Sequence, residues 1–186
     1  MPVDDLLTSA KHRMDRSIET VREEFNSVRT GRASTALLDR IAVDYYGQRT
    51  PLKQLATIST PEPRLLTVQP FDPSSLKAVE KAIMESDLGL TPSNDGRVVR
   101  LPIPQLTEER RKELVKLVRH MAEEGRVAVR NVRRDAIHHL KELSSSSEIG
   151  DDDERRAEEQ TQKLTDEHVK VIDELLKVKE AEIMEV

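Results

Sequence analysis

The feature that most constrains this chain is the stretch of residues 107–143, which has the apolar period of a single long helix. Apolar and small residues recur there at steps of three or four positions, close to the helical repeat of about 3.6 residues per turn. We expect them to form a packing face, which consists of Leu114, Val118, Met121, Gly125, Ala128, Val132, Ala136, Leu140 and Leu143. A helix with such a face needs other helices to cover it.

A second face of the same helix is made of guanidinium groups. With a turn of about 100° per residue, four arginines fall within about 60° of one another, on a side roughly 120° from the packing face. These residues, which we call the arginine stripe, are Arg119, Arg126, Arg130 and Arg133. Residues 125–134 (GRVAVRNVRR) contain four arginines and no acidic residue, although the net charge of the chain is -5 at pH 7. The stripe therefore indicates a polyanionic partner.

An intramolecular partner for the stripe is the alternative. Residues 107–143 hold ten basic and seven acidic side chains, whereas residues 148–186 hold six basic and 14 acidic ones. Part of the basic excess could thus pair with the acidic C-terminal segment across a bundle. Exposed ion pairs contribute only about 0 to 1 kcal/mol and do not require an acid-free run of arginines. The sequence therefore favours the polyanion and leaves the pairing open.

Two further long helices are predicted, over residues 3–30 and from Asp151 onward. Their packing positions are Leu7, Ala10, Met14, Ile18, Val21, Phe25 and Val28 in the first, and Ala157, Thr161, Leu164, His168, Val171, Leu175 and Val178 in the last. We expect Gly31 to cap the first helix and the serine run of residues 144–147 to reverse the chain. The three helices predict an antiparallel bundle about 45 to 55 Å long, and these interruptions disfavour the alternative of a dimeric coiled coil.

Residues 32–104 change to a β-rich pattern. Alternating apolar residues at Ile41, Val43 and Tyr45, followed by a turn at residues 47–48, predict a hairpin. Further elements are predicted as strands at residues 55–58, 65–68 and 97–101 and as a short helix that begins at Asp72. Eight of the nine prolines lie between residues 51 and 104, which sets this part of the chain apart from the helices.

The expected fold class is therefore α+β, with a long antiparallel three-helix bundle and a small inserted β/α/β domain. The bundle is discontinuous, comprising residues 1–30 and 105–186, and the small domain comprises residues 31–104. Because the chain must pass between the two domains twice, we expect the connection to be a two-stranded hinge.

No residue pattern of an enzyme or a cofactor site is apparent. The chain has no cysteine, no phosphate-binding glycine loop, no dinucleotide fingerprint and no paired-histidine zinc motif. Asp135 and His139 could share a metal ion, but two ligands without a third make a weak site, so we expect Asp135 to bond an arginine or a neighbouring helix. His168 falls on the packing face and is expected in the core. We predict no catalytic residue, no metal site and no cofactor.

Two adjacent tyrosines, Tyr45 and Tyr46, could stack on a nucleic-acid base. Strand alternation directs one of them toward the sheet core, so a structural role is favoured. At the N-terminus, no signal or transit peptide is visible, and no apolar run approaches the roughly 18 residues of a membrane span. We therefore expect a soluble cytoplasmic protein.

Six segments, in order along nearly the whole chain, resemble the bacterial ribosome recycling factor family. They are TGRAS at residues 30–34, DYYG at 44–47, TPLKQLA at 50–56, VEKAIMESDLGL at 79–90, LTEERRKEL at 106–114 and RVAVRNVRRDA at 126–136. Each segment alone is a weak signal, but six in register are specific. The departure at His138 and His139, where the family often has small polar residues, affects nothing central.

The resemblance implies a three-helix bundle joined by a hinge to a small β/α/β domain, in a protein that is not an enzyme. It implies binding to the large ribosomal subunit and its 23S rRNA. Together with elongation factor G, which hydrolyses GTP, such a protein splits post-termination ribosomes into subunits and releases mRNA and tRNA. We expect it to act as a monomer, without a membrane partner.

The family's RNA contacts map onto Arg130 and Arg133 of the arginine stripe. The residue pattern adds four weaker RNA-binding candidates, which are Arg126, Arg119, Arg29 and Arg32. The last two could equally offset the dipole at the end of the first helix. By the same resemblance, the hinge residues are Thr30, Gly31, Pro104 and Gln105.

Two other classes of function compete with this interpretation. A bundle with an acidic helix could be a scaffold or chaperone that binds helices of other proteins, and its binding would lack the steep salt dependence of RNA binding. An unrecognised hydrolase is the second alternative, and it could be supported only by a substrate screen.

Overall fold

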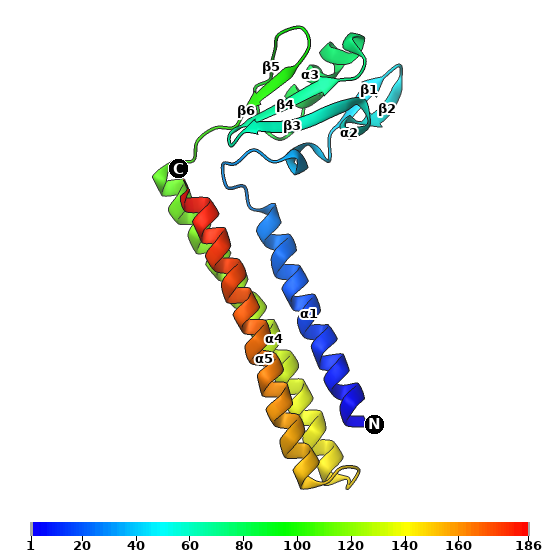
Figure 1. Cartoon of the computed structure of the whole chain (residues 1–186), viewed down its shortest axis with the longest axis vertical. Coiled ribbons are helices and arrows are strands. Elements are labelled where there is room, and N and C mark those ends of the chain that lie inside the picture. The colour runs from blue at the N-terminus through cyan, green and yellow to red at the C-terminus, as the bar shows by residue number, and fades with distance from the viewer. Residues whose placement is uncertain (1, 186) are drawn as a thin grey trace. The chain divides into compact units, whose positions relative to one another are not determined.

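The computed structural model describes residues 2–185 and divides the chain into two compact units (Figure 1). The helical unit takes in the chain up to Arg29 and from Thr107 onward, and the small unit is Thr30–Leu106. Mixed α+β architecture, with long helices and a small β domain, agrees with the fold class expected from the sequence.

The helical unit consists of α1 (Pro2–Ser27), α4 (Glu108–Ser145) and α5 (Asp151–Met184), each in contact with the other two. Their directions follow from the side chains that meet. Arg13 of α1 pairs with Asp135 of α4, and Val21, later in α1, lies beside Gly125, which comes earlier in α4. The two helices therefore run in opposite directions. Because α4 also runs opposite to α5, α1 and α5 are parallel.

Local signals in the sequence determine where two of these helices begin. The Thr107 hydroxyl accepts a hydrogen bond from the backbone N–H of Arg110 at 3.1 Å, which caps α4. Glu108 and Glu109 follow in its first turn, where the helix dipole favours acids. Four acidic residues likewise occupy the first turn of α5, which begins after Gly150.

The end of α1 differs from the expectation. The helix ends at Ser27, so Gly31 is not its cap, although Gly31 does have the positive φ, +76°, that was expected of it. Val28 still donates its N–H to the carbonyl of Phe25 at 3.1 Å, as in a last turn. The chain therefore leaves the helix before the glycine, and Gly31 belongs to the small unit.

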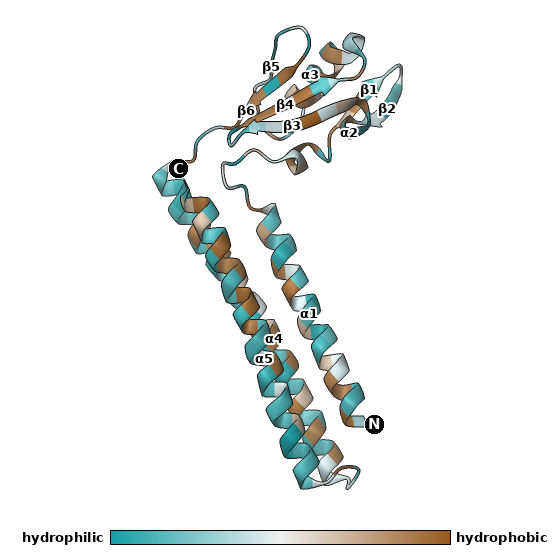
Figure 2. Ribbon diagram, in the orientation of Figure 1, coloured by the Kyte–Doolittle hydropathy of each residue, from teal (hydrophilic) through white to brown (hydrophobic). Residues whose placement is uncertain are grey.

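The packing face of α4 is largely as expected, but at two positions the buried residue is the one that follows the expected residue in the sequence. Ala122 and Val129 are buried, whereas the expected Met121 and Ala128 are only half-buried, as is Leu143. Adjacent residues differ by about 100° on the helix, so the neighbouring helices decide which of two apolar residues faces inward. In Figure 2 hydrophobic residues recur along each helix between hydrophilic ones.

The packing face of α5 was predicted less well. Its buried residues are Ala157, Thr161, Thr165, His168, Ile172 and Ile183, while the expected Leu164, Val171 and Leu175 are half-buried. Val178, also expected inside, is 60% exposed. The expected positions repeat every seven residues, and a straight α-helix drifts by about 20° per heptad from such a repeat. The error therefore grows along the helix and is largest at Val178.

The small unit contains two antiparallel sheets. One sheet pairs β1 (Ala42–Tyr45) with β2 (Gln48–Pro51), and the other has the strand order β3-β4-β6-β5. The strands of the second sheet are β3 (Ala56–Glu62), β4 (Leu65–Pro70), β6 (Val99–Pro102) and β5 (Ser93–Asn94). Two short α-helices, α2 (Leu52–Leu55) and α3 (Leu76–Met84), complete the unit with the 3-10 turns Thr35–Leu38 and Pro73–Ser75.

A hydrophobic core joins α3 to these sheets. Val43 of β1, Leu66 of β4, Val79 of α3 and Leu101 of β6 are fully buried in it, together with further apolar residues of α3, β4 and β6. The β1–β2 turn lies at Tyr46 and Gly47, whose positive φ values of 49° and 78° suit a tight hairpin. This turn begins one residue earlier than the sequence suggested.

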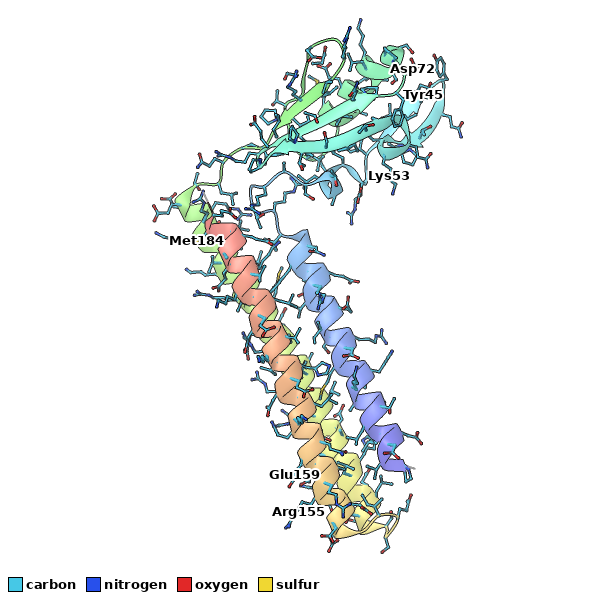
Figure 3. The ribbon with its side chains drawn as sticks, viewed as in Figure 1. Tyr45, Lys53, Asp72, Arg155, Glu159 and Met184 are labelled. Carbon is cyan, nitrogen blue, oxygen red and sulfur yellow. The ribbon has the colours of Figure 1, made fainter. Side chains whose placement is uncertain are left out.

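The two tyrosines of this hairpin have different surroundings. The Tyr45 hydroxyl donates to Asp72 Oδ2 at 2.9 Å, and Asp72 also caps the turn before α3 by accepting from the N–H of Ser74 (Figure 3). Tyr46 is 82% exposed. The expectation that one ring turns inward is met in part by the half-buried Tyr45, which links β1 to the start of α3.

Candidate nucleic-acid interface

The middle of α4 positions the arginine stripe. Arg126, Arg130 and Arg133 follow one another at steps of four and three residues, so they project from neighbouring turns of the helix. Val129 and Val132 lie between them in the sequence and are buried, which fixes this face of α4 to the outside of the unit. The stripe therefore stands on a rigid element.

Two members of the stripe are tied to acidic residues of α5. Arg119 Nε lies 2.5 Å from Glu180 Oε1, and Arg126 Nη2 lies 2.7 Å from Asp173 Oδ1. The side chain of Arg126 is only 20% exposed, and it also pairs with Glu123 at 3.1 Å. These arginines join α4 to α5, which is the intramolecular pairing that the sequence left open.

The other two members of the stripe have no acidic partner among the described residues of α5. Arg130 Nη2 lies 2.5 Å from Oε1 of Glu123, two turns earlier on the same helix, and its side chain is 44% exposed. Arg133 Nη1 donates to the neutral amide oxygen of Gln162 at 2.8 Å. Within the stripe, α5 therefore neutralises Arg119 and Arg126 but leaves Arg130 and Arg133 without an acidic partner from that helix.

Glu123 is the acidic residue that belongs to the stripe itself. Hydrogen bonds from Arg130 first, and then from Arg126, hold the pKa of Glu123 below its ordinary value. Its carboxylate is therefore ionised near neutral pH and remains bound to both guanidinium groups. Sequence reasoning missed Glu123, although its spacing of three and seven residues from these arginines places it near the same helix face.

The remaining arginine candidates lie apart in the sequence from the stripe. Arg29 ends the first segment of the helical unit, and Arg32 lies in the small unit. Both take part in interactions within the structure. Binding of RNA by these two arginines stays a prediction.

The expected hinge residues all fall within the limits of the small unit. Thr30 and Gly31 open that unit, and Pro104 and Gln105 precede its last residue, Leu106. A Cβ built on Gly31 would lie 3.0 Å from Leu106 Cγ, so the two connections approach each other closely. The chain enters and leaves the small unit through adjacent segments.

Asp135 and His168, two polar residues elsewhere in the bundle, each contact another helix. Asp135 pairs with Arg13 of α1 at 2.8 Å, which confirms the expected arginine partner, and no group of three potential metal ligands exists among residues 2–185. His168 is 7% exposed, as expected of a core residue. None of the helices in this described part of the chain has the length and apolar character needed to cross a membrane.

Known proteins resemble this chain over almost its whole length. The family described as "Ribosome recycling factor" matches residues 21–184. The ribosome-recycling factor of Rubrobacter xylanophilus is 61% identical over 180 residues, which cover 97% of each chain. That of Alkaliphilus metalliredigens is 56% identical over 95% of each chain.

Two solved structures share the fold. One, a solution structure of ribosome recycling factor, has a TM-score of 0.78 and 45% identity and covers 100% of this chain and 99% of its own. The other, with a TM-score of 0.65 and 48% identity over 100% of both chains, belongs to models of the Thermus thermophilus factor and Escherichia coli elongation factor G bound to a post-termination complex.

Proposed function

Because the chain belongs to the ribosome recycling factor family, its function is ribosome recycling, and we propose that Arg130 and Arg133 anchor it on ribosomal RNA. Guanidinium groups bind phosphate oxygens through paired N–H donors, and such contacts position a protein without reading base sequence. The bundle is thus held on the large subunit by its rigid central helix. The chain acts as a non-enzymatic factor.

One observation carries the choice of these two arginines. Of the four stripe residues, Arg119 and Arg126 are committed to Glu180 and Asp173 of α5, whereas Arg130 and Arg133 have no acidic partner there. A phosphate that bound Arg126 would have to displace two carboxylates from a side chain that is only 20% exposed. Arg130 presents more of its side chain and has its acidic partner on its own helix.

The proposed partner in recycling is elongation factor G, which is bound together with the recycling factor to the post-termination complex of the structural relative. Elongation factor G would hydrolyse the GTP, and the small unit would be the part that it pushes. Movement of that unit would occur at Thr30, Gly31, Pro104 and Gln105, where the chain enters and leaves it. We place this action in the cytoplasm because the ribosome is the partner, and we propose a monomer.

Co-sedimentation with ribosomes at two salt concentrations tests the anchor. The unaltered chain should pellet and lose affinity steeply as salt rises, because phosphate contacts release counterions. The Arg130→Ala/Arg133→Ala variant should remain folded and stay in the supernatant. The Arg119→Ala/Arg126→Ala variant removes the same charge and serves as the matched control. Under conditions in which this variant is folded, it should still pellet with ribosomes.

Two results would contradict the proposal. Equal pelleting of the unaltered chain and the Arg130→Ala/Arg133→Ala variant would place the anchor elsewhere. A binding affinity that does not change with salt concentration would favour the scaffold or chaperone interpretation, in which the partner is a protein helix. If the anchor holds, a subunit-splitting assay with elongation factor G and GTP then tests the movement of the small unit.

A further inference from the structure

The arginine stripe contains one carboxylate in a position where a phosphate could bind. Glu123 lies 2.5 Å from Arg130 Nη2 through Oε1, and 3.1 Å from Arg126 Nη1 through Oε2. Each of its oxygens thus accepts from a different guanidinium group, as two oxygens of a phosphate would. Its side chain is 51% exposed, so the pair lies on the surface where RNA would approach.

The position of Arg130 indicates what this carboxylate does. Seven residues separate Arg130 from Glu123, so the arginine side chain must lie along the helix to reach back over two turns. A phosphate oxygen that bound the same edge of the guanidinium would meet the negative charge of Glu123 within a few ångströms. Binding of a phosphate at this edge of Arg130 therefore requires exchange of one anion for another.

Arg126 holds Glu123 in place for this exchange. Asp173 of α5 accepts from Arg126 Nε and Nη2 at 2.8 and 2.7 Å, which orients the guanidinium. Its remaining Nη1 then donates to Glu123. Charges of opposite sign alternate along Asp173, Arg126, Glu123 and Arg130. Of the two arginines, Arg130 is the more exposed, at 44% against 20% for Arg126.

We infer that Glu123 is a specificity-determining residue of the RNA anchor, an internal competitor that lowers the affinity of Arg130 for isolated phosphates. This inference rests on the proposed function of the stripe. A folded ribosomal RNA surface, which presents several phosphates at fixed positions, can displace the carboxylate. A plain RNA helix or single strand engages fewer groups at once and is disfavoured by the same repulsion.

Two variants of equal charge separate this role from a general effect of net charge. Glu123→Gln removes the competing charge and keeps an acceptor of similar shape. Glu124→Gln is the matched control, because Glu124 is the next residue, is exposed, and pairs with His120 at 3.3 Å rather than with the stripe. Binding of both variants is measured with ribosomes and with a short RNA duplex of arbitrary sequence.

We expect Glu123→Gln to raise the affinity for the RNA duplex by a factor of about two to five relative to Glu124→Gln, the ratio that one exposed ion pair provides. Affinity for ribosomes should rise less. The slope of log affinity against log salt for the duplex should steepen by up to about 0.9, as one more phosphate is engaged. Adding Arg130→Ala should abolish the difference between the two glutamine variants.

The outcomes that overturn this inference differ from those that overturn the proposed function. Equal duplex affinity of Glu123→Gln and Glu124→Gln would show that net charge alone matters. A lower affinity of Glu123→Gln would show that the carboxylate helps to bind RNA by orienting Arg130. Unchanged ribosome binding by Arg130→Ala/Arg133→Ala, in contrast, would remove the ribosomal anchor itself.

Discussion

His168 Nε2 of α5 lies 2.7 Å from Asp15 Oδ1 of α1, and the contact joins a buried imidazole to a half-exposed carboxylate. The opposite ring nitrogen, Nδ1, lies 2.7 Å from the carbonyl oxygen of Leu164. The ring is therefore held from both sides. This contact links the first helix to the last, although 153 residues separate the two side chains in the sequence.

Loss of this contact should destabilise the bundle. We expect His168→Ala to lower the free energy of unfolding by about 2 to 3 kcal/mol, because it removes a buried ring and leaves a cavity. Asp15→Asn should cost less, about 1 kcal/mol, since the carboxylate is half-exposed and solvent screens the pair. Urea denaturation of both variants measures these values. A smaller loss for His168→Ala than for Asp15→Asn would contradict this account.

The stability of the bundle should also depend on the ionisation of Asp15. Hydrogen bonds from Lys11 first, and then from His168, hold the pKa of Asp15 below its ordinary value. Ionised Asp15 therefore stabilises the folded chain above that ordinary value, about 4, and the contribution is lost as pH falls through the lower folded value. Unfolding curves between pH 6 and 3 should show a smaller decline for Asp15→Asn than for the unaltered chain.

Arg126 and Arg130 should respond differently to truncation, although they are one helical turn apart. Arg126→Ala should lower the free energy of unfolding by about 1 kcal/mol, because it breaks the link to Asp173. Arg130→Ala should leave stability nearly unchanged and weaken ribosome binding by about 1 to 3 kcal/mol, on the scale of a charge-assisted contact. Thermal denaturation and ribosome binding, measured on the same samples, compare them. Equal losses of stability would show that Arg130 is structural too.

Structural features that depend on only a few adjacent residues, such as helix caps, could be predicted from the sequence. Thr107 caps α4, and Asp72 caps the turn before α3, because each such signal lies within three residues of the backbone group that it serves. The length of α4 followed in the same way from the uninterrupted apolar period. Tertiary contacts were not needed to place these elements.

Features that depend on the register between helices could not be predicted. Asp173, the partner of Arg126, lies 47 residues away in the sequence, and many acidic residues of α5 were equally plausible partners. The burial of Ile172 in place of Val171 likewise depends on how far α5 turns along its length. The stripe could thus be located from the sequence, but the folded bundle was needed to show which of its arginines pair with acidic residues of α5.

Gly31 allows a final test at the entrance to the small unit. Its φ of +76° suits glycine, and an added Cβ would lie 3.0 Å from Leu106 Cγ. Gly31→Val should therefore disturb both the backbone and the neighbouring connection, and slow subunit splitting with elongation factor G. Gly89→Val is the matched control, because Gly89 has a φ of +66° but nothing within 4 Å of its added Cβ. If Gly31→Val splits ribosomes as fast as the unaltered chain, or both variants are slowed alike, Gly31 has no special part in the movement.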